Sequence, residues 1–128
     1  MKKKRCLDNL TPDERAALDE FVHRLRAKYA DQVLLVRLFG SKARGDFDAE
    51  SDVDVLVVVR SNDWRFSDDV ALEACDPMLE HNVVISPTVV GAEHYRWLEA
   101  HKAPFYRAVH RDGVDLWTKT PVPSFVSA

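Results

Sequence analysis

Two aspartates, Asp52 and Asp54, stand directly before an apolar segment that covers residues 55–59. In a β-strand, residues i and i+2 point to the same face of the sheet, so the two carboxylates would project side by side. Adjacent carboxylates repel each other unless a cation lies between them, and Mg²⁺ prefers carboxylate and phosphate oxygens. The alternative is that both residues line the solvated face of an amphipathic strand. A carboxylate pair is costly at the end of a strand that is apolar on both faces, but the pair alone leaves both interpretations open.

A second motif, Gly40-Ser41, ends the apolar segment that precedes the aspartates. Glycine at the end of a strand lets the chain turn tightly and lets a ligand approach the backbone. A serine that opens a helical turn presents its hydroxyl and nearby backbone N–H groups to an anion, as in many phosphate sites. Taken alone, the pair is equally a simple turn with a capping serine. Because the two motifs bracket one strand–turn–strand unit, together they favour a site that holds Mg²⁺ and a nucleotide.

The elements that position these motifs follow from hydrophobic patterns and helix-start signals. Thr11 offers an N-cap hydroxyl, Pro12 suits the first helical position, and Glu14 completes a capping box. An apolar stripe at helical spacing then predicts a helix over about 12–29 with a solvated charged face. Apolar runs predict strands at 33–39 and 52–59, joined by a short helical turn at 41–44 and a polar loop.

The second half of the chain alternates weaker helical patterns with short strands. A helix over 64–79 is predicted, and Pro77 indicates that it bends or ends early; strand 83–90 carries Pro87, which indicates an edge or a bulge. Helices over 92–100 and from 105, and an extended segment at 114–117, complete the order. We therefore expect an α/β (α+β) domain over 11–119, a small mixed β-sheet with helices packed mainly on one side. Residues 1–10 are predicted to be a basic N-terminal tail and 120–128 a C-terminal tail.

Composition excludes several classes of protein. The 128 residues include 18 Lys and Arg against 21 Asp and Glu, a formal net charge of −3, which argues against broad attraction to nucleic acid. Neither a signal peptide nor an apolar segment long enough to cross a membrane is found. The two cysteines, Cys6 and Cys75, form no zinc-binding pattern and are expected as free thiols in a reducing cytoplasm.

The string G-S-x-A-R-G followed by S-D-x-D resembles the signature of the nucleotidyltransferase superfamily that includes DNA polymerase beta. Within it, the chain is most similar to the minimal MNT type, strongly over 33–60 and more weakly over about 11–119. The resemblance implies the nucleotidyltransferase fold, triphosphate binding by Gly40 and Ser41, and catalytic Mg²⁺ held by Asp52 and Asp54. Arg44 takes the family's arginine position, where it would contact phosphate or brace the loop, although a surface arginine is an equal alternative. Lys42 is expected to be solvated.

The implied activity is transfer of a nucleoside monophosphate from a Mg²⁺-bound NTP, with ATP expected, to a hydroxyl of a protein or small molecule. The alternative that the resemblance implies is an antitoxin-like protein paired with a HEPN-type toxin, which binds nucleotide with weak or no catalysis. Active members carry a third carboxylate on a later strand, but strand 83–90 contains no acid. Ser86 is its best polar candidate. Either Glu80 or a partner supplies the missing group, or the domain is slow or inactive. Nucleotide binding is therefore predicted more firmly than transfer.

Overall fold

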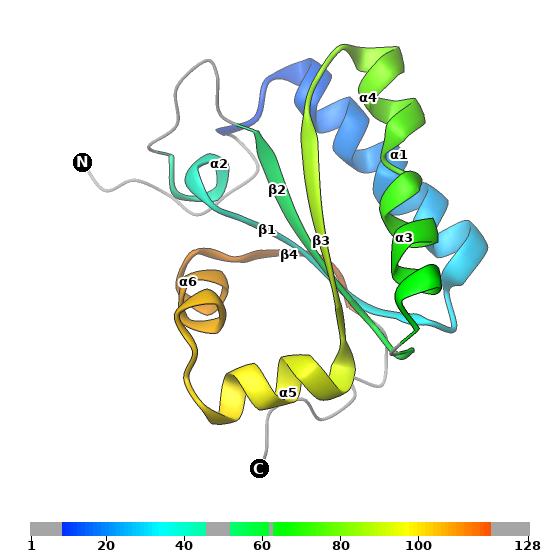
Figure 1. The fold of residues 1–128 in the computed structure, drawn as a ribbon. Helices are drawn as coiled ribbons and strands as arrows, with labels where there is room; N and C mark the ends of the chain where they lie inside the picture. Colours follow the sequence, from blue (N-terminus) through cyan, green and yellow to red (C-terminus); the bar gives the residue numbers. More distant parts are fainter. Residues whose placement is uncertain (1–8, 46–51, 62, 119–128) are drawn as a thin grey trace.

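A computed structural model describes residues 9–45, 52–61 and 63–118, in which four strands form one mixed sheet. The strands are β1 (Val33–Phe39), β2 (Val53–Val59), β3 (Ile85–Gly91) and β4 (Val114–Thr118). Their order across the sheet is β3-β2-β1-β4 (Figure 1). Strand β1 runs antiparallel to both β2 and β4, whereas β3 runs parallel to β2. The mixed α/β fold that the sequence predicts is confirmed.

Helix α1 (Pro12–Tyr29) begins with the predicted capping box. The hydroxyl oxygen of Thr11 accepts a hydrogen bond from the Glu14 backbone N–H at 3.1 Å, and the Glu14 carboxylate accepts one from the Thr11 N–H at 2.9 Å. These bonds satisfy two N–H groups that would otherwise lack partners at the helix start. The first turn of α1 is thereby fixed, and with it the position of the Glu14 side chain.

The predicted helix over 64–79 is two helices, α3 (Trp64–Leu72) and α4 (Cys75–His81). The interruption falls at Glu73 and Ala74, shortly before Pro77, so the helix ends early as predicted. Proline has no N–H and its ring clashes with the carbonyl four residues earlier, which here is Glu73. Pro77 is tolerated because it lies in the first turn of α4.

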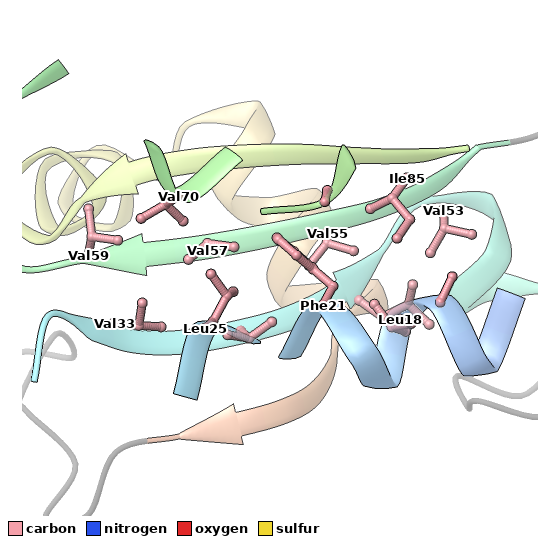
Figure 2. Packing of buried hydrophobic residues seen from close by; sticks show 14 of the residues in the cluster. Leu18, Phe21, Leu25, Val33, Val53, Val55, Val57, Val59, Val70 and Ile85 are labelled. Carbon is pink, nitrogen blue, oxygen red and sulfur yellow. The ribbon is translucent and has the colours of Figure 1, made fainter. Parts of the chain in front are cut away.

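Helices cover both faces of the sheet, and the larger layer lies on one side, consistent with the predicted architecture. Helices α1, α3 and α4 pack on one face over a core that includes Phe21 and Leu25 of α1 and alternate residues of β2 (Figure 2). The short helices α5 (Ala92–Ala100) and α6 (Pro104–Asp112) cover part of the other face. Helix α2 (Ser41–Arg44) is the predicted turn after β1.

The alternation of side chains along β2 determines where the two aspartates point. Val53, Val55, Val57 and Val59 all face the α1 layer, where each is fully buried. Leu56 and Val58 instead join the cluster beneath α5 and α6. Asp54 has the same parity as these two residues, so its carboxylate lies on the α5–α6 face.

Proline in a strand removes one hydrogen-bond donor of the sheet ladder, so it is found on edge strands. Pro87 lies on β3, which ends the strand order of the described sheet, as predicted. Most of the two predicted tails, residues 1–8 and 119–128, falls outside the described residues. Asn9 and Leu10 are described: the Asn9 amide donates to the Ala43 carbonyl at 3.3 Å, and Leu10 packs on the core. None of the described helices is long and apolar enough to span a membrane.

Phe21→Ala is expected to lower the free energy of unfolding by about 3–5 kcal/mol, because Phe21 is fully buried between α1 and the sheet. Chemical denaturation measures this change. Leu79→Ala is the matched control, since Leu79 is 82% exposed and its loss should change stability by no more than about 0.5 kcal/mol. Equal effects of the two substitutions would contradict the observed packing.

Candidate functional site

The Gly40 turn lies directly against the carboxylate of Asp54. Pairing of β1 with β2 sets Phe39 opposite Asp54, so the next residue along β1 passes the aspartate side chain. A Cβ atom at Gly40 would collide with Oδ2 of Asp54 and would lie 3.1 Å from its Cγ. Gly40 also has a φ of +78°, which side chains rarely adopt. Two motifs that the sequence separates are therefore brought into contact, and only glycine permits that contact.

Helix α2 is a single turn that presents Ser41 next to this contact. The Gly40 carbonyl accepts hydrogen bonds from the N–H groups of Ala43 and Arg44, at 3.1 and 3.0 Å. Gly45, with a φ of +92°, closes the turn by donating its N–H to the Ser41 carbonyl at 2.8 Å. At the start of a helical turn the first N–H groups have no partner within the turn and point away from it. An anion placed there can accept hydrogen bonds from them. The half-buried Ser41 stands at that start.

The two predicted metal ligands differ in their surroundings. Asp52 immediately precedes β2 and is exposed, whereas Asp54 lies within β2 and is half-buried. Burial raises the pKa of the Asp54 carboxyl, the negative charge of Asp52 raises it further, and Arg44 opposes both effects. Burial and a nearby like charge both make an ionised carboxylate unfavourable. A cation bound beside it would therefore stabilise it. The donor set, two carboxylates beside an open phosphate-type turn, fits a divalent cation that prefers oxygen ligands.

Ser86 is the residue of β3 that lies beside the aspartates. The parallel register pairs it with Asp54, and its hydroxyl donates a hydrogen bond to Oδ2 of Asp52 at 2.9 Å. No residue of β3 is acidic, as the sequence indicates. The position next to the two carboxylates on this strand is therefore held by a neutral hydroxyl.

Arg44 braces the turn through a buried aspartate of α6. Its Nη1 lies 3.1 Å from Oδ2 of Asp112, whose side chain is 6% exposed. Arg111 donates two further hydrogen bonds to Asp112, at 2.9 and 3.1 Å. The hydrogen bonds from Arg111 are the main cause that lowers the pKa of the Asp112 carboxyl, and burial opposes this effect. Of the predicted alternatives for Arg44, bracing is the contact that the structure displays.

The expectation that Lys42 is solvated is wrong. Lys42 is 3% exposed, and its ammonium lies 2.9 Å from Oε2 of Glu14 at the start of α1. Glu14 thus uses one carboxylate oxygen to cap α1 and the other to hold α2. The partner lies in another helix, so the local pattern around Lys42 gives no sign of it.

Glu80, considered as a substitute third acid, is placed in a different group of side chains. It lies on α4 and bonds to Glu20 of α1, which raises the pKa of Glu80, and His81 stands beside both. The ligand atoms of these three residues lie within 4.8 Å of one another. Arg24 already supplies a positive charge to this group, with Nε 3.4 Å from Glu20 Oε2. The group connects α1 and α4, on the sheet face opposite to Asp54.

Comparison with known proteins identifies similar chains. Residues 18–124 match the family described as Nucleotidyltransferase domain. A protein of Methanocaldococcus jannaschii named "Putative protein adenylyltransferase MJ0604" is 39% identical over 106 residues, 82% of this chain and 99% of the relative. Another from the same organism, "Putative protein adenylyltransferase MJ0141", is 36% identical over 100 residues, 77% of this chain and 94% of the relative. A solved structure of a "putative nucleotidyltransferase from Sulfolobus solfataricus" superposes with a TM-score of 0.49 at 20% identity, over 92% of this chain and 91% of that chain, too loosely to bear on function.

Gly40→Ala is expected to abolish binding of a nucleotide and a divalent cation, because its Cβ would displace the Asp54 carboxylate. Calorimetric titration of the nucleotide with Mg²⁺ measures the change. Gly45→Ala is the matched control: it also imposes a side chain at positive φ, but among the described residues the atoms nearest to its Cβ would be those of the Asn9 side chain, from an ordinary 3.4 Å. Both variants should lose stability, by about 1 kcal/mol or more, and only Gly40→Ala should lose binding. Equal binding by the two variants would contradict the contact.

Asp54→Asn is expected to raise the melting temperature of the metal-free protein at neutral pH. Folding raises the pKa of Asp54, so above that pKa the ionised carboxylate is less favourable in the folded chain than in the unfolded chain. The gain should disappear as the pH falls below the ordinary Asp pKa, where the carboxyl is protonated in both the folded and the unfolded state. Thermal unfolding at neutral and acid pH measures the gain, with the exposed Asp68→Asn as control. A lower melting temperature of Asp54→Asn at neutral pH would refute this explanation.

Proposed function

This chain belongs to the nucleotidyltransferase domain family, and from that premise we propose that it transfers a nucleoside monophosphate from Mg²⁺-bound ATP to a hydroxyl group of a protein. The observation that carries the proposal is the contact between the Gly40 turn and the Asp54 carboxylate. It brings a group suited to phosphate next to a group suited to a cation, and Mg²⁺-nucleotide requires both at once. A hydroxyl of a small molecule is the wider alternative for the acceptor.

The proposed roles follow the positions of the side chains. Asp52 and Asp54 would hold Mg²⁺, which when bound supplies positive charge to the triphosphate oxygens. The backbone of the Gly40-Ser41 turn and the Ser41 hydroxyl would hold the β- and γ-phosphates and orient the leaving pyrophosphate. Arg44, which lies near enough to lower the pKa of Asp54, would add positive charge on the same side of the site.

In the proposed reaction, the acceptor oxygen attacks the α-phosphorus and forms a new P–O bond. The bond between the α-phosphorus and the bridging oxygen breaks, and pyrophosphate leaves with the electron pair. The hydroxyl proton passes to solvent, because β3 supplies no carboxylate to accept it. Positioning and electrostatic stabilisation by the residues named above would then account for most of the rate enhancement.

A protein acceptor is preferred because the two relatives from Methanocaldococcus jannaschii described above are each named "Putative protein adenylyltransferase". We also propose a cytoplasmic location, where Cys75, an exposed free thiol, would remain reduced. The alternative, an antitoxin paired with a HEPN-type toxin, stays a prediction from the family resemblance. A neighbouring reading frame that encodes a short helical protein with R-x(4–6)-H would support this alternative.

The proposal predicts that the protein transfers label from α-labelled ATP, but not from γ-labelled ATP, to protein in an extract of the source organism supplied with Mg²⁺. Asp52→Asn/Asp54→Asn should reduce this transfer by at least about 100-fold, because it removes both cation ligands. Asp68→Asn/Asp69→Asn is the matched control, since it removes the same charge from exposed positions of α3. Transfer that survives in the first variant, or label that comes from the γ-phosphate, would contradict the proposed reaction.

A further inference from the structure

The hydrogen bond between Ser86 and Asp52 joins two strands at the proposed cation site. Ser86 and Asp52 are 34 positions apart, and the parallel pairing of β2 with β3 brings them together. Ser86 has the same parity along β3 as Val90, which belongs to the cluster on the α5–α6 face. Its hydroxyl therefore lies on the face that carries the two carboxylates.

The side chain of Asp52 is less confined than that of Asp54, so the bond to Ser86 matters for its orientation. Asp54 lies within β2 and its side chain is confined by the backbone of Gly40. Asp52 precedes the strand and is exposed, so packing does not confine its side chain to one orientation. A carboxylate that must stop rotating when it binds a cation loses conformational entropy at that moment. A hydrogen bond that fixes the carboxylate beforehand reduces this loss.

Resting on the proposed function, we propose that Ser86 is the positioning residue of the cation site. Its hydroxyl holds Oδ2 of Asp52, and Oδ1 is the oxygen that would bind the cation. Hydrogen bonds to ligating carboxylates orient them in this way, and their removal typically weakens metal binding by about 10–100-fold. Because the bond is exposed to solvent, the expected effect is at the lower end of that range or below it.

If Ser86 had a purely structural role, its loss would change the stability of the sheet and not the affinity for a cation. The bond connects the outer strand β3 to the start of β2, so its loss could loosen the strand pairing without any effect on a cation. A structural bond would change the melting temperature, and a positioning bond would change the cation affinity. The two readouts must therefore be measured on the same variants.

Ser86→Thr and Ser86→Val form a matched pair for this test. Both side chains are β-branched and similar in shape, which suits a strand, but only threonine keeps the hydroxyl. The probe is Mn²⁺, titrated alone and with a non-hydrolysable ATP analogue, and binding is followed by electron paramagnetic resonance of free Mn²⁺. Ser86→Val should bind Mn²⁺ about 3–10-fold more weakly than wild type, and Ser86→Thr should bind nearly as well as wild type. Thr88→Val, two residues along the same face of β3, removes a hydroxyl with no expected loss of affinity.

The outcomes separate this inference from the proposed function. If wild type binds Mn²⁺ with the analogue and the threonine and valine variants bind equally well, Ser86 does not position Asp52, while the proposed function stands. If the valine variant loses only melting temperature, the bond is structural and the inference fails. If wild type binds no Mn²⁺ even with the analogue, the proposed function fails and the inference fails with it.

Discussion

The closeness of Gly40 to Asp54 is the constraint on which the rest of the site depends. The antiparallel register of β1 and β2 fixes it, because Phe39 stands opposite Asp54 and the chain then turns over the aspartate side chain. A residue with a Cβ at position 40 would force either the turn or the carboxylate to move. The site is therefore not a feature added to the surface of the sheet. It follows from which residues are paired at the end of two central strands.

The turn after Gly40 is held from two sides by ion pairs. Lys42 reaches Glu14 at the start of α1, and Arg44 reaches Asp112 at the end of α6. These helices lie on opposite faces of the sheet, so the turn connects the two helical layers (Figure 1). Desolvation offsets most of the attraction in a buried ion pair, but the loss of one partner leaves an uncompensated charge that costs about 3–5 kcal/mol. The pairs therefore fix the position of the turn more than they add to overall stability.

Much of this arrangement could be predicted from local sequence signals. The capping box at Thr11 and Glu14 and the edge position of Pro87 both follow from rules that concern residues close together in the sequence. The break between α3 and α4 follows from a local rule as well, because a proline acts on the carbonyl four residues before it. The roles of Lys42 and Asp112 could not be predicted in this way. Lys42 pairs with Glu14 of another helix, and Asp112 pairs with Arg44, 68 positions away, so only the folded chain brings these residues together.

We propose that one site holds the nucleotide phosphates and the cation together, because the Gly40 turn is in contact with the Asp54 carboxylate. The most direct test of this central claim is calorimetric titration of a non-hydrolysable ATP analogue into the wild-type protein, with Mg²⁺ and with a chelator. Phosphates brought next to Asp54 without a cation would be repelled, so the affinity should fall by at least about tenfold when Mg²⁺ is removed. An affinity that is the same with and without Mg²⁺ would contradict the claim.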